Sequence, residues 1–326
     1  MPGIWSRHPK YFIFVFVVLV TTFYLLNPIT PLPDPATFGL RFKNDLAGRL
    51  ERADVIYDKM LQDRKGLIKK FGPSPSDVMM FPPVTPPYPP YTVWDFFPAA
   101  YNCPHDLQRL GALGDGGKWV CGITRVEKKR DCVVYSFGIN YESSFEAAIL
   151  DNTDHCQIWG YDFSVKSFGP EIPESQANRT HFHPYKLGGE DLAAVPEKEE
   201  PPMYTLSTLM KQNGHTHIDI LKVDIESWEF DLLTTLVKAY RNAGLPLPFG
   251  QLQLEIHAWH KSFKDFLEWW QMLEEAGLRP FWTEPNLVYN NYNRGGTADL
   301  AEYSFINIKG DNIFINEGLA GRRRDH

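Results

Sequence analysis

The chain has 326 residues, of which 43% are hydrophobic and 14% aromatic, so it is long enough for one large domain with additional segments. Its formal net charge is -7 at pH 7. Proteins that bind nucleic acid present a basic face to the phosphates, and this charge balance therefore argues against nucleic acid as the main partner.

The N-terminal segment predicts a membrane anchor. Residues 11–26 form an uncharged apolar run that follows Arg7 and Lys10. As a helix this run would span about 24 Å, which suits the thinner bilayers of the early secretory pathway. Because no small-residue cleavage site follows, a retained signal anchor is favoured over a cleaved signal peptide. The basic residues predict a cytosolic tail over residues 1–10 and a luminal body, in a single-pass type II membrane protein of the endoplasmic reticulum or Golgi.

Two further features are typical of a luminal body. Four cysteines are present, an even number that can pair in three different ways: Cys103, Cys121, Cys132 and Cys156. Asn178 begins the one N-glycosylation sequon, in a polar segment. The alternative interpretation is that the cysteines are free buried thiols and the sequon arises by chance.

Residues 27–100 are predicted to form a stem between the anchor and the body. Half of the 26 prolines lie in it, and such a segment favours extended conformations over a packed core. Within it, residues 44–71 carry apolar side chains at the spacing of an amphipathic helix, interrupted only by Arg64. This helix is expected either to form a short coiled coil, which would allow a homodimer, or to lie against the body.

The folded body is expected over residues 101–316, before a disordered basic tail at 317–326. Strands are predicted at residues 133–137, 157–161, 180–183, 218–223, 252–256, 280–283 and 303–308. Helices are predicted between them at residues 143–150, 205–212, 228–242 and 263–276. This alternation is typical of an α/β fold with a mostly parallel sheet, and the last two strands are expected to form an antiparallel hairpin at its edge.

The strongest functional signal lies at residues 133–162. A buried strand ends at Gly138, a short helix follows, and a second strand ends at Asp162 about 24 residues after the glycine. The glycine would let the backbone approach a ligand, and the acid would accept hydrogen bonds from ribose hydroxyls. Asn140 stands where a second glycine is common, and asparagine tolerates left-handed geometry. The pattern predicts a site for a nucleoside-containing cofactor.

Ionisable residues also follow one another at the ends of two later strands. Lys222 and Asp224 share one face of their strand, and Glu255 and His257 repeat this arrangement on the next strand. In an open parallel sheet, ligands bind beyond the carboxyl ends of the strands, so we expect these side chains to line one crevice. The alternative is a buried ion-pair network that only orders the sheet.

Six fragments of the body together resemble the methyltransferase-like protein 24 family. They are residues 115–121, 135–138, 144–146, 218–226, 253–257 and 302–307. Residues 221–226 are also similar to FkbM-type methyltransferases. The resemblance covers about residues 100–310 and implies a doubly wound, Rossmann-like class I methyltransferase fold that uses S-adenosyl-L-methionine.

The resemblance directs the choice of site residues. Carried over by position, it implies that Gly138 faces the methionine end of the cofactor, that Asp162 faces the ribose and that Asp224 lies beside the methyl group. The expected cofactor-binding residues are Ser136, Phe137, Gly138, Asn140, Glu146 and Asp162. The expected catalytic residues are His257, Asp224, Lys222 and Glu226. His257 is the first candidate for the base because its intrinsic pKa is near neutral, and Asp224 is the second.

The predicted reaction is O-methylation of a hydroxyl on a secretory-pathway glycan or a small metabolite. A divalent metal held by Asp224, Glu226 and His257 is conceivable but is not predicted. One alternative function is a type II membrane glycosyltransferase, which would use residues 224–226 as its acidic metal motif. The other is a non-catalytic binding protein that retains the fold.

Overall fold

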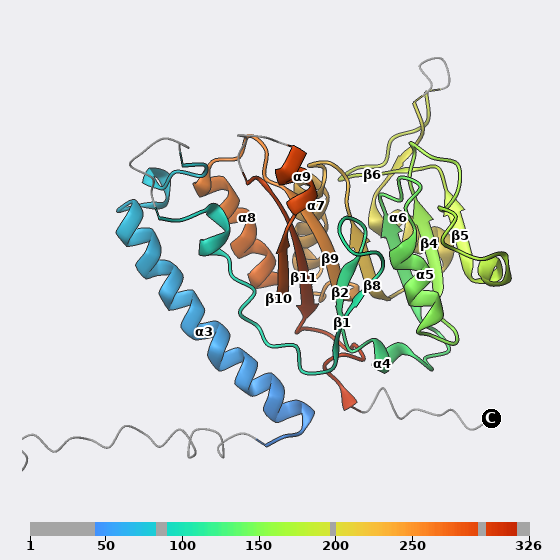
Figure 1. Ribbon diagram of the computed structural model, residues 1–326, viewed down its shortest axis with the longest axis horizontal. Coiled ribbons are helices and arrows are strands. Elements are labelled where there is room, and N and C mark those ends of the chain that lie inside the picture. The colour runs from blue at the N-terminus through green and yellow to red at the C-terminus, as the bar shows by residue number, and fades with distance from the viewer. Residues whose placement is uncertain (1–42, 83–89, 196–199, 293–297, 318–326) are drawn as a thin grey trace, which may run out of the picture. The chain divides into compact units, whose positions relative to one another are not determined.

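A computed structural model describes residues 43–82, 90–195, 200–292 and 298–317 (Figure 1). From Asp45 onward these residues belong to one compact unit. The predicted anchor at residues 11–26 and the predicted tail beyond Glu317 lie outside the described residues. Within the described ranges, no helix is both long and apolar enough to cross a membrane.

A seven-stranded sheet forms the centre of the unit, in the order β10-β11-β9-β8-β3-β4-β5. The strands are β3 (Val133–Phe137), β4 (Gln157–Tyr161), β5 (Thr180–His183), β8 (Ile218–Val223), β9 (Phe249–His257), β10 (Leu278–Pro285) and β11 (Leu300–Asn307). Only β11 runs against the other six, because it pairs antiparallel with both β9 and β10. The predicted antiparallel pair is therefore present, but β11 lies between β9 and β10, so β10 is the edge strand.

Helices cover both faces of the sheet. One face packs against α6 (Leu206–Asn213), α7 (Glu229–Asn242) and α8 (Phe263–Ala276). The other face packs against α4 (Ile123–Val126), α5 (Ser144–Asp151) and the antiparallel pair β1 (Leu107–Leu110) and β2 (Lys118–Cys121). In Figure 1, β1, β2 and α5 lie in front of the sheet and α6 and α7 behind it. The result is the predicted mixed α/β architecture with a mostly parallel sheet.

Short elements complete the unit. They are the 3-10 helices Pro75–Asp77, Val93–Phe96 and Glu174–Arg179, the parallel pair β6 (Lys186–Leu187) and β7 (Met203–Tyr204), and α9 (Leu287–Tyr292). The central strands were predictable because they are covered on both sides and consist of apolar runs. Every residue of β8 and β9 is buried, which makes the ionisable residues in these strands unusual.

The amphipathic helix predicted at residues 44–71 is α3 (Leu46–Phe71), and it packs against the body. The hydroxyl of Tyr57 donates a hydrogen bond to Glu274 of α8. The two terminal nitrogens of Arg64 each lie 2.9 Å from an oxygen of the same carboxylate. The residue that interrupts the apolar spacing is thus the partner of a largely buried acid. The compact unit consequently begins at Asp45, earlier than the predicted boundary near residue 101.

The cysteine pairing that the sequence leaves open is resolved. Cys103 is bonded to Cys121, and Cys132 is bonded to Cys156. The first disulfide joins the segment before β1 to the end of β2, and the second joins the starts of β3 and β4. The sequon residue Asn178 is exposed, as its polar surroundings predict.

Candidate active site

The residues predicted to carry chemistry meet at the carboxyl ends of the parallel strands. In the sheet, Phe137 of β3 is aligned with Tyr161 of β4 and with Val223 of β8. Gly138, Asp162 and Asp224 therefore follow at the same level of three adjacent strands. Between β3 and β8 the order of the strands changes direction, which is where open α/β sheets bind ligands.

Strained backbone gathers at the same edge. Among the described residues, those with positive φ other than glycine are Asn140, Tyr141, Glu226, Ser227 and His260. The first two follow β3, the next two follow β8, and His260 follows β9. Side chains disfavour this left-handed geometry, and such strain is concentrated at functional sites. Asn140 has the left-handed conformation that its sequence position predicts, with φ of 45°.

Gly138 is required by the packing of two strands. Its φ is 81°, and a Cβ at this position would lie 1.9 Å from the backbone oxygen of Asp224. The sequence suggested that this glycine makes room for a ligand. The structure shows that it makes room for the chain at the end of β8. The absence of a side chain at Gly138 lets the turn after β3 contact the backbone of Asp224.

The carboxylate of Asp162 fixes the turn that contains this glycine. One of its oxygens accepts hydrogen bonds from the backbone nitrogens of Ile139 and Asn140, at 2.8 and 2.9 Å. The other accepts from the backbone nitrogen and the hydroxyl of Ser164, both at 2.7 Å. Asp162 is buried, and its carboxylate accepts from four protein donors. Its contact with a ribose stays a prediction.

A buried polar group lies beneath the turn. The hydroxyl of Ser136 donates to Oε1 of Glu146, and Nζ of Lys222 lies 4.0 Å from the same oxygen. Lys222 donates to the carbonyl of Gly138 at 2.5 Å, so it supports the turn. The second oxygen of Glu146 is buried without a hydrogen-bond partner among the described residues.

Phe137 departs from its predicted role. Its ring is 1% exposed and stacks on the ring of Tyr161 with the centroids 4.8 Å apart. The side chain therefore belongs to the hydrophobic core, and only the backbone of Phe137 reaches the edge where the other candidate residues meet.

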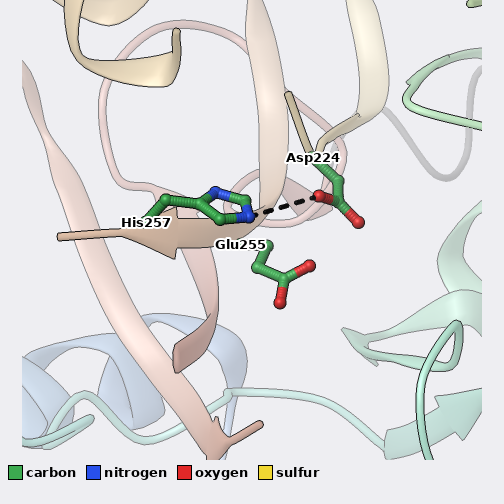
Figure 2. A group of neighbouring side chains, drawn as sticks. All are labelled: Asp224, Glu255 and His257. Atoms are coloured by element: carbon green, nitrogen blue, oxygen red, sulfur yellow. Dashed lines mark ion pairs between the residues drawn. The ribbon is translucent and has the colours of Figure 1, made fainter. Parts of the chain in front are cut away.

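His257 is held in place by a buried acid that the sequence interpretation missed. Oε1 of Glu229 accepts a hydrogen bond from the backbone nitrogen of His257 at 2.7 Å and lies 3.3 Å from its Nδ1. Nε2 then faces Asp224 at 4.0 Å and Glu226 at 3.6 Å, and Figure 2 shows the imidazole directed at the Asp224 carboxylate. Glu226 is 74% exposed, whereas the His257 side chain is 2% exposed.

The carboxylates around the imidazole favour its charged form. Burial disfavours the charged form of His257, but the hydrogen bond and charge of Glu229, together with the charges of Asp224 and Glu226, outweigh it and raise its pKa. A base must lose its proton before it can accept another, so this result weighs against His257 as the base in the ligand-free protein. The geometry still places Nε2 at the strand ends.

Asp224 and Glu255 form an interacting pair of carboxyl groups. Burial disfavours ionisation of Asp224, but the ammonium groups of Lys118 and Lys222 outweigh it and lower its pKa. Burial and the charges of Asp224 and Glu302 raise the pKa of Glu255 to about 10. At neutral pH the proton of the pair is therefore held by Glu255, and Asp224 is ionised.

Three contributors to the site were missed from the sequence. Besides Glu229, these are Lys118 on β2 and Glu302 on β11, which form an ion pair. Glu302 lies directly opposite Glu255 in the sheet. Glu302 stands inside the apolar run of β11, as Lys222 does in β8, and this criterion would have found it. Lys118 is the first residue of β2 and gives no such signal.

Comparison with known proteins agrees with this geometry. The sequence matches the family described as "Methyltransferase domain" over residues 91–306. It is 29% identical over 140 residues to "Probable methyltransferase-like protein 24" of Homo sapiens, which is 42% of this chain and 36% of that protein. The protein of the same name from Rattus norvegicus is 27% identical over 146 residues, which is 44% of this chain and 38% of that protein. The chain thus matches less than half of the length of these relatives.

Solved structures with a related arrangement are more distant. The Methanococcus jannaschii fibrillarin pre-rRNA processing protein is 15% identical, with 62% of this chain and 71% of that chain covered and a TM-score of 0.33. Methyltransferase FkbM from Methylobacillus flagellatus is 15% identical, with 54% and 44% covered and a TM-score of 0.31. At these scores the likenesses do not identify a ligand or a reaction. The family match spans most of the chain and confirms the predicted resemblance, so the chain belongs to this methyltransferase-domain family.

Proposed function

We propose that this chain transfers a methyl group from S-adenosyl-L-methionine to a hydroxyl of a secretory-pathway glycan or a small metabolite. Membership of the methyltransferase-domain family supports the reaction class. The observation that carries the proposal is the alignment of Gly138, Asp162 and Asp224 at the ends of three adjacent strands, where the strand order changes direction.

The charges at this edge suit the proposed cofactor. When bound, S-adenosyl-L-methionine supplies an electrophilic methyl group on a positively charged sulfur. Asp224 is ionised, and the buried second oxygen of Glu146 lacks a donor beside the turn that Gly138 begins. The unsatisfied acceptor of Glu146 fits a ligand that carries an amino group, and ionised Asp224 is assigned to the acceptor side. We assign the cofactor to the turn after β3, with Glu146 beneath it and Asp162 holding the turn.

Asp224 and His257 form the acceptor side of the proposed site. Methyl transfer from a sulfonium needs no covalent enzyme intermediate, so the protein mainly positions the donor and the acceptor, which is worth up to about 7–11 kcal/mol in favourable cases. Asp224 is 25% exposed and can be approached from solvent, while buried Glu229 holds His257 behind it. The acceptor hydroxyl would give its proton to the ionised carboxylate of Asp224.

Ligand-induced stabilisation tests the proposed activity. Purified protein is heated with S-adenosyl-L-methionine, with a nucleotide sugar, or alone, and the melting temperature is recorded. Only a ligand that binds the folded state raises this temperature. At 100 times its Kd, such a ligand stabilises the folded state by about 2.7 kcal/mol. We expect a rise with S-adenosyl-L-methionine alone. A rise with the nucleotide sugar alone would favour the glycosyltransferase, and no rise with either would remove the proposed activity.

The disulfides support the proposed compartment. All four cysteines are paired, and disulfides persist mainly in oxidising compartments. We place the body in the lumen of the endoplasmic reticulum or Golgi, attached through the predicted anchor at residues 11–26. The exposed Asn178 should then carry a glycan.

Electrophoretic mobility after endoglycosidase treatment tests this placement. The protein made in secretory cells should migrate faster after the treatment, whereas an Asn178→Gln variant should already migrate at the faster position. An unchanged mobility of the unmodified sequence would contradict the luminal placement while leaving the proposed reaction open to its own test.

A further inference from the structure

Three side chains at the ends of β8 and β9 form a cluster with metal-ligand chemistry. Asp224, Glu255 and His257 each offer one ligand atom, and these atoms lie within 4.8 Å of one another. Figure 2 shows the imidazole directed at the Asp224 carboxylate, with the Glu255 side chain beside the pair. β8 and β9 are paired up to Val223 and Leu254, one residue before Asp224 and Glu255. Glu255 and His257 are also paired with β11, so the sheet sets the backbone positions from which the three ligands project.

Nε2 of His257 is directed into the cluster, where the carboxyl groups of Asp224 and Glu255 also contact each other. Glu229 holds His257 from the Nδ1 side, and Nε2, on a side chain only 2% exposed, has no hydrogen bond within the described part of the chain. A carboxylate at one imidazole nitrogen with the other directed into the site is typical of histidines that bind metals. Glu255 is positioned similarly, because the amide of Asn286 donates to its Oε1 at 2.8 Å.

The surrounding charges distinguish this cluster from a neighbouring one. Glu255 and Glu302 face each other directly across β9 and β11. Lys118 forms an ion pair with Glu302. A second group of possible ligands, Asp115 with Glu255 and Glu302, is therefore a poorer choice, since Glu302 is already engaged and Asp115 is exposed.

We propose that Asp224, Glu255 and His257 bind a divalent first-row cation, with Glu229 as the positioning residue for His257. Two carboxylates with one imidazole suit Mn²⁺, which accepts both oxygen and nitrogen ligands. This set differs from the one conceivable from the sequence, because buried Glu255 replaces the exposed Glu226. The inference rests on the proposed function in one respect: the cation would lie on the acceptor side, where it would favour the deprotonated form of a bound hydroxyl.

Mn²⁺ binding to the full chain, after treatment with a chelator and dialysis, tests the site directly. Free Mn²⁺ is measured by electron paramagnetic resonance during a titration. We expect one saturable site, loss of detectable binding in both Glu255→Gln and His257→Gln, and an affinity about 10–100-fold lower in Glu229→Gln. Asp115→Asn is the matched control, since it removes an acid of the neighbouring group and leaves the three proposed ligands.

Three results of the titration would contradict the proposed cation site. Absence of saturable binding to the unaltered protein, or binding that survives both ligand substitutions, would overturn the site. Loss of binding in Asp115→Asn would assign the cation to the neighbouring group and also overturn it. The circular dichroism spectrum of each variant verifies that it is folded. Binding of S-adenosyl-L-methionine to the chelator-treated protein is measured separately, so that failure of the proposed function and failure of the cation site give different results.

Discussion

Asp224→Asn should lower kcat/KM for methyl transfer by about 10²–10⁴-fold, the range that a group acting on the transferred proton contributes. Asp224 is the ionised member of the buried carboxyl pair and is partly exposed at the end of β8. Asparagine has nearly the same shape but no charge. We therefore expect the fold and the affinity for S-adenosyl-L-methionine to change little while turnover is lost. Isothermal titration and a radiolabelled methyl-transfer assay measure the two quantities.

Asp219→Asn is the matched control for this experiment. Asp219 lies on the same strand as Asp224 but toward its other end, where its carboxylate accepts hydrogen bonds from Lys129 and from the backbone of Val133, both at 3.0 Å. The same chemical change there should reduce stability and leave turnover of the folded protein close to normal. Full activity in Asp224→Asn, or equal losses in both variants, would contradict the assignment of the site to the carboxyl ends of the strands.

Arg64→Ala is expected to lower the free energy of unfolding by about 3–5 kcal/mol, as is usual when one partner of a buried ion pair is removed. The side chain of Arg64 is 4% exposed, and its Nε also donates to the carbonyl of Phe96 at 2.7 Å. Without the guanidinium, the largely buried carboxylate of Glu274 would keep the donors from Tyr57 and Trp270 among the described residues. Urea denaturation followed by tryptophan fluorescence measures the change.

An exposed ion pair on the same helix provides the comparison. Lys59 lies 2.9 Å from Asp63, with side chains 78% and 66% exposed. Lys59→Ala should cost no more than about 0.5 kcal/mol, because solvent screens such pairs. Similar losses in the two variants would show that α3 does not depend on Glu274 for its attachment.

The sequence was sufficient for the elements and for the level at which the site lies. The apolar runs that became β3, β4 and β8 were recognisable because strands covered on both faces contain few polar residues. Gly138, Asp162 and Asp224 were expected at strand ends, and the sheet aligns them there. Local patterns determine where a strand stops, and in a parallel sheet this is enough to bring distant residues to one edge.

The partners of the charged residues were not predictable in the same way. Lys222 reaches the Gly138 carbonyl at the end of the adjacent strand β3, 84 positions away in the chain, and Lys118 reaches Glu302 across 184 positions. Such contacts depend on the order of the strands and on side-chain conformations, which periodicity does not encode. For α3, the apolar spacing indicated a buried face but not whether that face meets another chain or this one, and the partner became evident only with Glu274.

The left-handed residues at the strand ends lower the stability of the folded protein. Each non-glycine residue held in that geometry costs of the order of 1–3 kcal/mol, and five of them follow the carboxyl ends of β3, β8 and β9. Selection for heat resistance alone would therefore replace Tyr141 and Ser227 by glycine and gain stability there. The presence of bulkier residues at these positions therefore points to a role other than stability.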